Sequence, residues 1–198
     1  MRKVPQQARS RAMVERIVEA ARVVLVRDGY ESFTTNRVAD EAEVSPGSLY
    51  QYFPDKSALV TVVMDRWSAE ISDRVAASLA ASGPVDVKDP GTVRAIADAL
   101  LTAIEADAGL LRIVWEELPA VRHRAAQHAL EQRVRELLAV YLAAAGATSV
   151  DPAARAWVIV MAVENVAVRW VLDQPPISRE ALLDEFSALA GGLGARSR

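Results

Sequence analysis

The chain has 198 residues and a formal net charge of −3 at pH 7, a length that suits one domain or a small module joined to a larger one. Apolar residues make up 52% of the chain, enough to bury a core, so a disordered tail is excluded. Cysteine is absent and histidine occurs only as His123 and His128, which excludes disulfide scaffolds, thiolate zinc sites and cysteine nucleophiles. We expect no catalytic residue, no metal, no cofactor and a cytoplasmic location.

Charge and hydropathy are unevenly distributed along the chain. The run Ala156–Val163 has eight apolar residues without a polar atom in any side chain except the Trp157 indole, whereas a membrane span needs about 20, so no membrane partner is expected. The basic N-terminal start lacks the apolar stretch of a secretory signal. The first 30 residues hold seven basic and three acidic side chains, so we expect any polyanion to be bound at the N-terminal end.

The spacing of apolar residues predicts an all-α fold of about nine helices and no convincing strand. Gly29 ends the first helix and the segment 82–91, with two prolines and two glycines, is the clearest linker. Asp55 and Asp151 are candidate N-caps of the helices that follow them, and Ser178 is a candidate cap at the start of the last predicted helix. The predicted helices run over residues 10–28, 35–43, 46–53, 56–80, 90–106, 110–118, 119–145, 152–172 and 178–189.

Two short predicted helices follow one another closely near the N-terminus, at residues 35–43 and 46–53. Thr34 and Ser45 are good N-caps, and Pro46 occupies a first helical position, where a missing N–H breaks no intrahelical bond. Two short helices with a tight turn are typical of a helix-turn-helix, whose second helix enters the DNA major groove. On spacing alone, an ordinary helical corner is the alternative.

The string GYESFTTNRVADEAEVSPGSLYQYFPDKSALV (29–60) resembles the N-terminal signature of the TetR family of transcriptional regulators. The matching features are Gly29-Tyr30, Thr34-Thr35, Val38-Ala39, Val44-Ser45, Gly47, Leu49-Tyr50, Tyr52-Phe53, Lys56 and Leu59. The resemblance covers residues 10–62. It implies a helix-turn-helix DNA-binding domain with a basic arm at residues 1–55, followed by a C-terminal domain at 56–198 for effector binding and dimerisation.

The same resemblance implies roles for side chains in and beside the two short helices. Thr35, Tyr52 and Lys56 are expected to bind phosphates, and Tyr50 to face the groove, with both tyrosines exposed. Asn36 and Gln51 carry the amides best suited to base edges, because such groups pair with adenine. The full set expected to bind DNA is Thr34, Thr35, Asn36, Ser45, Pro46, Gly47, Ser48, Tyr50, Gln51, Tyr52 and Lys56.

Pro46 and Gly47 stand where some members of the family present polar side chains to the bases. Neither residue has a side-chain donor. Recognition at these positions therefore depends on van der Waals contact, on the backbone or on DNA shape, and the operator sequence is not predicted.

The helix predicted at 152–172 is apolar on nearly all sides, so it must be covered on two sides. One side belongs to the core of this chain. As the resemblance implies, the other side meets a second copy, with the last helix completing a four-helix interface; a core formed within one chain is the alternative. The expected interface residues are Trp170, Leu182, Leu183 and Phe186.

The resemblance also implies a small-molecule pocket in the C-terminal domain. Glu164 interrupts an apolar stripe, and a buried carboxylate needs a partner or a ligand. The alternative is an ordinary core or interface with satisfied polar groups, and His123 and His128 are expected on a solvated face. The candidate ligand-binding residues are Trp67, Trp115, Glu116, Tyr141, Trp157, Glu164 and Asn165.

Together these observations predict a transcriptional regulator rather than an enzyme. The expected partners are double-stranded DNA with a palindromic operator, a second copy of the chain and an unidentified small-molecule effector that releases a repressor from DNA. The alternatives are a protein-binding adaptor with the same fold and a DNA-binding protein without ligand control.

Overall fold

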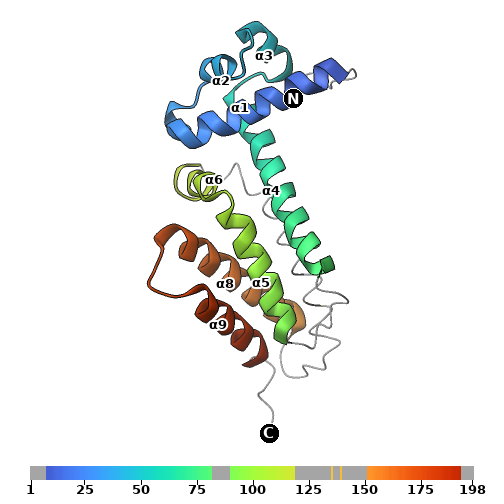
Figure 1. The fold of residues 1–198 in the computed structure, drawn as a ribbon, viewed down its shortest axis with the longest axis vertical. Coiled ribbons are helices and arrows are strands. Elements are labelled where there is room, and N and C mark those ends of the chain that lie inside the picture. Colours follow the sequence, from blue (N-terminus) through green and yellow to red (C-terminus); the bar gives the residue numbers. More distant parts are fainter. Residues whose placement is uncertain (1–7, 82–89, 119–134, 136–138, 140–150, 193–198) are drawn as a thin grey trace. The chain divides into compact units, whose positions relative to one another are not determined.

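The computed structural model describes residues 8–81, 90–118, 135, 139 and 151–192 (Figure 1). Within these ranges the chain is helical and contains no strand, which confirms the all-α prediction. The predicted helix 119–145, Tyr141, His123, His128, the arm 1–7 and most of the linker lie outside the described residues. The helices are α1 (Ala8–Ser32), α2 (Thr35–Glu41), α3 (Pro46–Tyr52), α4 (Lys56–Ala81), α5 (Pro90–Glu105), α6 (Ala108–Arg112), the π-helical turn η1 (Ile113–Glu117), α8 (Pro152–Asp173) and α9 (Arg179–Gly192).

The chain divides into two compact units, which we describe separately. The first unit comprises residues 1–68 and 109–126, and the second comprises residues 69–108 and 127–198. Helix α4 contributes to both units. The described segment 109–118 therefore belongs to the same compact unit as the N-terminal helices, although residues 69–108 separate the two in the sequence.

All five capping side chains named from the sequence bond to the first turn of their helix, as predicted. Their oxygens accept hydrogen bonds from backbone N–H groups of the first helical turn, which have no intrahelical acceptor. The donor–acceptor distances are 3.3 Å for Thr34 with Arg37, 3.1 Å for Ser45 with Ser48, 2.8 Å for Asp55 with Ala58, 3.0 Å for Asp151 with Ala153 and 3.2 Å for Ser178 with Ala181.

The core of the first unit is built on the apolar face of α1. The six residues that the helical period places on this face are at most 5% exposed: Val14, Ile17, Val18, Ala21, Val24 and Leu25. Helix α1 packs on α2, and α2 packs on α3, with Phe33 and Phe53 fully buried between helical segments. Burial of each large apolar side chain stabilises such a core by about 1.5–3 kcal/mol.

The end of α1 is held by η1 through a backbone contact that the sequence did not predict. Gly29 interrupts α1 with a φ of 76°, a conformation that favours glycine. At this point the Glu117 carboxylate accepts a hydrogen bond of 2.6 Å from the backbone N–H of Tyr30. The predicted helix 110–118 is thus two elements, α6 and a π-helical turn, and its last residues fix the break in α1.

In the second unit, α5 packs against both α9 and α8, and α8 also contacts α9 (Figure 1). Gln174 ends α8 in the left-handed region, with a φ of 47°, and two prolines follow it. The buried face of α9 consists of Leu182, Leu183 and Phe186, each at most 5% exposed.

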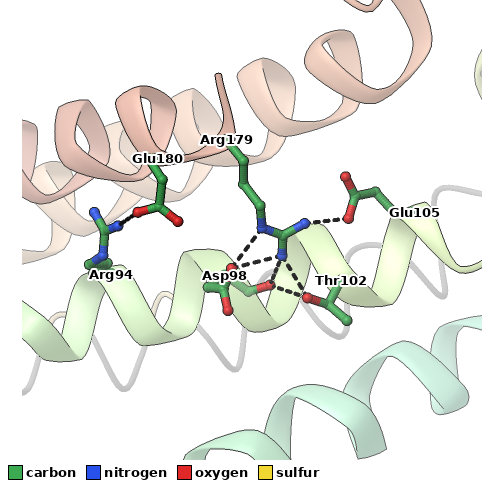
Figure 2. Close-up of polar contacts among 6 residues, drawn as sticks. All are labelled: Arg94, Asp98, Thr102, Glu105, Arg179 and Glu180. Atoms are coloured by element: carbon green, nitrogen blue, oxygen red, sulfur yellow. Dashed lines mark hydrogen bonds and ion pairs between the residues drawn. The ribbon is translucent and has the colours of Figure 1, made fainter. Parts of the chain in front are cut away.

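Charged side chains connect α9 to α5 along the edge of their contact. Arg179 of α9 donates to Asp98 at 2.8 Å and to the Thr102 hydroxyl at 2.6 Å, and it also pairs with Glu105 (Figure 2). A second contact has the arginine on α5 and the acidic residues on α9: Arg94 pairs with Glu180 and Asp184. The two helices are therefore joined by arginines that come from both sides of the interface.

Candidate DNA-binding site

The turn between α2 and α3 has the tight geometry of a helix-turn-helix. Glu43 adopts a φ of 53°, which turns the chain sharply after α2. The Val44 N–H then donates to the Ala39 carbonyl at 2.9 Å. Because Ser45 caps α3 directly afterwards, the second helix starts in a fixed orientation relative to the first.

Helix α3 has one buried face and one exposed face. Leu49 and Phe53 are fully buried and Tyr52 is 6% exposed, which anchors the helix to the first unit. The opposite face carries Pro46, Gly47, Tyr50 and Gln51, all of them exposed. We call these four residues the outer face of α3; it contains no charged side chain.

Tyr50 projects from the outer face and is connected to α2. Its side chain is 42% exposed, and its hydroxyl lies 2.9 Å from the Thr35 hydroxyl. Each hydroxyl has one proton and two lone pairs, so both can still bond to a further group. The pair therefore places two hydroxyls from two helices at one point of the surface.

Tyr52 does not occupy the exposed position that the sequence predicted. It is 6% exposed, and its hydroxyl lies 2.8 Å from the Ser10 hydroxyl of α1. The reason is its spacing of three residues from Leu49, which places both side chains on the inner face of α3. The expectation of two exposed tyrosines is correct for Tyr50 and wrong for Tyr52.

Lys56 is only half-buried, but its ammonium group is engaged within the unit. Its Nζ donates to the Tyr30 carbonyl at 3.0 Å and lies 4.1 Å from the centre of the Tyr30 ring, a cation–π contact. Tyr30 is itself half-buried and supports Lys56. An ammonium carries three donors, so the bond to Tyr30 leaves Lys56 able to bind an anion as well.

Helix α2 exposes Thr34 and Asn36 beside the outer face of α3, while its basic residue is paired elsewhere. Arg37 bonds to Asp28 at 2.9 Å, and Arg27 bonds to Asp28 at 2.9 Å and to Glu41 at 2.6 Å. The hydrogen bond from Arg27, followed by that from Arg37, lowers the pKa of Asp28. The charges of these four side chains sum to zero, and Thr34, Asn36 and Gln51 are uncharged polar groups exposed on or beside the two short helices.

The chemistry of this surface suits the recognition of a duplex rather than catalysis. It combines hydroxyls, two amides and an apolar turn, and the described part of the chain contains no group of side chains able to hold a metal ion. None of the helices in that part is long and apolar enough to span a membrane.

Two family models match the chain in succession. Residues 17–63 match the model described as bacterial regulatory proteins of the tetR family, and residues 90–192 match that of the tetracyclin repressor-like C-terminal domain. The chain belongs to the TetR family. TetR-family members are transcriptional regulators that bind DNA, and this chain is one of these regulators and not an enzyme.

Individual TetR-family relatives support the assignment. The uncharacterized HTH-type transcriptional regulator YvkB of Bacillus subtilis is 30% identical over 136 residues, 67% of each chain. The HTH-type transcriptional repressor KstR of Mycobacterium tuberculosis is 38% identical over 52 residues, 26% of this chain and 24% of KstR. FadR of Bacillus subtilis, whose crystal structure contains stearoyl-CoA, shares the fold with a TM-score of 0.70 at 12% identity, over 93% of this chain and all of FadR.

The residues proposed for ligand binding are divided between the two compact units, except for Tyr141, which lies outside the described residues. Trp67, Trp115 and Glu116 belong to the first unit, whereas Trp157, Glu164 and Asn165 belong to the second. Trp157 is 51% exposed, and Glu116 and Asn165 are also exposed. Trp67 is different: among the described residues its indole Nε1 is a buried donor without an acceptor.

The structure also corrects the expected dimer surface. Leu182, Leu183 and Phe186 are 3–5% exposed within a single chain, because α9 packs its apolar face on α5. They are therefore not available to a second copy. Trp170 is half-buried, and its Nε1 donates to the Ile177 carbonyl at 2.9 Å.

Several contacts of the site had no signal in the sequence. The bonds from Thr35 to Tyr50 and from Ser10 to Tyr52 join residues 15 and 42 positions apart, and Glu117 reaches Tyr30 across 87 positions. Helical spacing relates residues three or four apart, so only the folded chain brings these groups together.

Proposed function

We propose that this protein is a homodimeric repressor that binds a palindromic operator through α3 and is released by a small-molecule effector. The observation that carries the proposal is the uncharged outer face of α3, held on a helix-turn-helix of the TetR family. One short helix contacts few base pairs, whereas two related by a twofold axis read half-sites about 34–36 Å apart. We place the protein in the cytoplasm, where it has access to bacterial DNA.

We assign the contacts with DNA to groups on α2, α3 and the start of α4. Tyr50 and Thr35 offer their hydroxyls to phosphate or to a base, while Asn36 and Gln51 offer amides to base edges. Lys56 binds a phosphate with a donor that Tyr30 does not use. Thr34, Ser45, Pro46, Gly47 and Ser48 complete the contact surface, and Tyr52 supports it from the inner face.

DNA binding is tested by selection from a random duplex library. Wild-type protein should enrich sequences that contain two inverted half-sites, and Tyr50→Ala should bind the enriched duplex at least tenfold more weakly. Glu31→Ala, an exposed change outside α2 and α3, is the control and should bind as the wild type does. Wild-type protein that enriches no sequence would contradict the proposal.

We assign the dimer contact to the exposed face of α8 instead of the buried face of α9. Val158 and Val166 are 50% and 44% exposed, and steps of four residues continue this face to Trp170, in agreement with the expected role of Trp170. Exposed apolar side chains in such a row are typical of a protein interface. A second copy related by a twofold axis would cover this row with the same row of its own.

The dimer is tested by sedimentation of Val166→Asp, which adds a charge to this row. We expect a shift from dimer to monomer, because an unpaired carboxylate at an apolar interface is unfavourable. Ala153→Asp is the matched control, since Ala153 is exposed on the first turn of the same helix. A dimer unaffected by Val166→Asp would contradict this interface, and a monomeric wild type would contradict the dimer.

We propose that the effector accepts a hydrogen bond from Trp67. A buried indole N–H without an acceptor is unfavourable by about 1–3 kcal/mol, and a ligand oxygen would remove that penalty. The first ligand to test is stearoyl-CoA, because FadR, which has the same fold, was crystallised with it. The effector acts only through its different affinities for the DNA-binding and released states.

Trp67→Phe tests this assignment because it removes the N–H and keeps an aromatic ring. Release of the selected duplex by stearoyl-CoA should need at least fivefold more ligand in this variant than in the wild type. No release of the wild type at any stearoyl-CoA concentration would exclude this ligand. Release of Trp67→Phe at the ligand concentration that releases the wild type would exclude Trp67 as the donor.

A further inference from the structure

The three glycines of the first unit differ in what surrounds them. Gly29 has a φ of +76°, and a Cβ added there would lie 2.9 Å from Oε2 of Glu117. A Cβ added to Gly109 would lie 2.8 Å from Cγ1 of Val26. Gly47 shows neither constraint: its φ is not positive, and the nearest atom to an added Cβ is Oγ of Ser45 at 4.0 Å.

The fold of the unit therefore explains Gly29 and Gly109 but not Gly47. Glycine is among the least favourable residues within a helix, because it loses more backbone freedom on folding than alanine does. Helix α3 has seven residues, so one unfavourable position matters. Alanine would fit at position 47 without displacing any neighbour inside the protein.

The polar groups next to Gly47 are already bonded to one another. The Ser45 and Ser48 hydroxyls lie 2.9 Å apart, and the Ser48 N–H donates to the Ser45 hydroxyl at 3.1 Å. The surface at Pro46 and Gly47 is therefore formed by ring carbons and a bare Cα. Such a surface fits closely against an apolar edge, such as a thymine methyl or a deoxyribose.

We infer that Gly47 is required by bound DNA, because duplex atoms approach its Cα too closely for any side chain. The inference rests on the proposed function. Gly47 lies three and four residues before Tyr50 and Gln51, so the three share the outer face of α3. A methyl group at position 47 would hold the whole face away from the groove, and the contacts of both neighbours would weaken with it.

The test compares stability and DNA affinity in the same variant, Gly47→Ala. The probe is the duplex enriched from a random library by wild-type protein. We expect affinity to fall at least tenfold, whereas the midpoint of thermal unfolding stays unchanged or rises by up to about 4 °C. Gly47→Val should bind more weakly still, since the obstruction is larger.

Pro46→Ala is the matched control, because it changes the same turn but removes atoms. Its affinity should remain above that of Gly47→Ala. Binding of Gly47→Ala within twofold of the wild type would overturn the inference while leaving the proposed function intact. An equal loss in Pro46→Ala, or a lower thermal midpoint in Gly47→Ala, would assign the effect to the turn and also overturn it. Failure of the wild type to enrich any duplex would instead remove the proposed function.

Discussion

Helices α3 and α9 bury similar faces but expose different ones. Helix α3 is anchored by Leu49 and Tyr52, and α9 is anchored by Leu182, Leu183 and Phe186, all nearly inaccessible. On the solvent side, α9 exposes Glu180, Asp184 and Glu185, whereas the outer face of α3 is uncharged. A polyanion is repelled by the first surface and not by the second.

This difference shows that apolar periodicity alone does not identify a recognition helix. Both helices bury the apolar residues of one face inside the molecule, and the exposed residues determine what each helix can bind. In α9 the exposed carboxylates Glu180 and Asp184 bond to Arg94 of α5 (Figure 2 draws the first of these). In α3 the exposed groups are an amide, a phenol and an apolar turn, which suit the edges of base pairs.

The largest expected effect tests whether the two inner faces are equivalent. Leu49→Ala and Leu183→Ala should each lower the free energy of unfolding by about 2–5 kcal/mol, because each leaves a cavity in a closed core. The measurement is urea unfolding at one protein concentration. Gln51→Ala and Glu185→Ala, on the exposed faces, should change the free energy of unfolding by about 0.5 kcal/mol or less. A small effect of Leu183→Ala would show that α9 is not closed within one chain.

The next prediction concerns the charged contact of α9. Arg179→Met should lower the free energy of unfolding by about 1–2 kcal/mol, since its guanidinium bonds to Asp98, Thr102 and Glu105 and is only 28% exposed. Arg94→Met should have a smaller effect, about 0.5 kcal/mol, because its acidic partners are 75% and 73% exposed. Equal losses in the two variants would mean that burial does not distinguish these arginines.

A smaller effect is expected at the edge of the recognition surface, where Lys56 has two roles. Lys56→Met should lower the free energy of unfolding by about 1 kcal/mol, because it removes the contacts with Tyr30. It should also reduce the slope of log affinity against log salt by about one, the value for one phosphate contact. Binding to the selected duplex at several salt concentrations measures the slope. An unchanged slope would restrict Lys56 to its structural role.

The smallest effect is a pH dependence beside α2. The pKa of Asp28 is lowered by its bonds to Arg27 and Arg37, so the stabilisation is present above about pH 4, the ordinary pKa of the group. It is lost as the pH falls through the lower pKa of the folded protein. Asp28→Asn should therefore be slightly less stable than the wild type at pH 7 and should equal it in strong acid. Parallel stability curves for the two proteins between these limits would refute this assignment.

Local signals in the sequence predicted the elements well. The N-caps at Thr34, Ser45 and Asp55 depend on contacts within three residues, and the buried stripe of α1 depends on one helical period. Both are properties of neighbouring residues, so they can be read before folding. The exposed positions of Tyr50, Asn36 and Gln51 follow from the same periodicity.

Side-chain roles that depend on distant partners could not be predicted in this way. The spacing of Tyr52 from Leu49 places it on the inner face of α3, but the partner of its hydroxyl, Ser10 of α1, lies 42 positions away. Phe186 is buried in this chain because α9 packs on α5. Periodicity identifies an apolar face but does not identify the surface that covers it.

The sequence by itself determined the helices, their caps and the motif that marks a TetR-family regulator, because these depend on residues within a few turns of one another. Only the tertiary structure decided which tyrosine of α3 is exposed and that the apolar face of α9 is closed within one chain. It also revealed that a Cβ at position 47 would meet only Oγ of Ser45, at 4.0 Å, among the described residues. The physical reason is that burial depends on which segments pack together, and these segments are far apart in the chain.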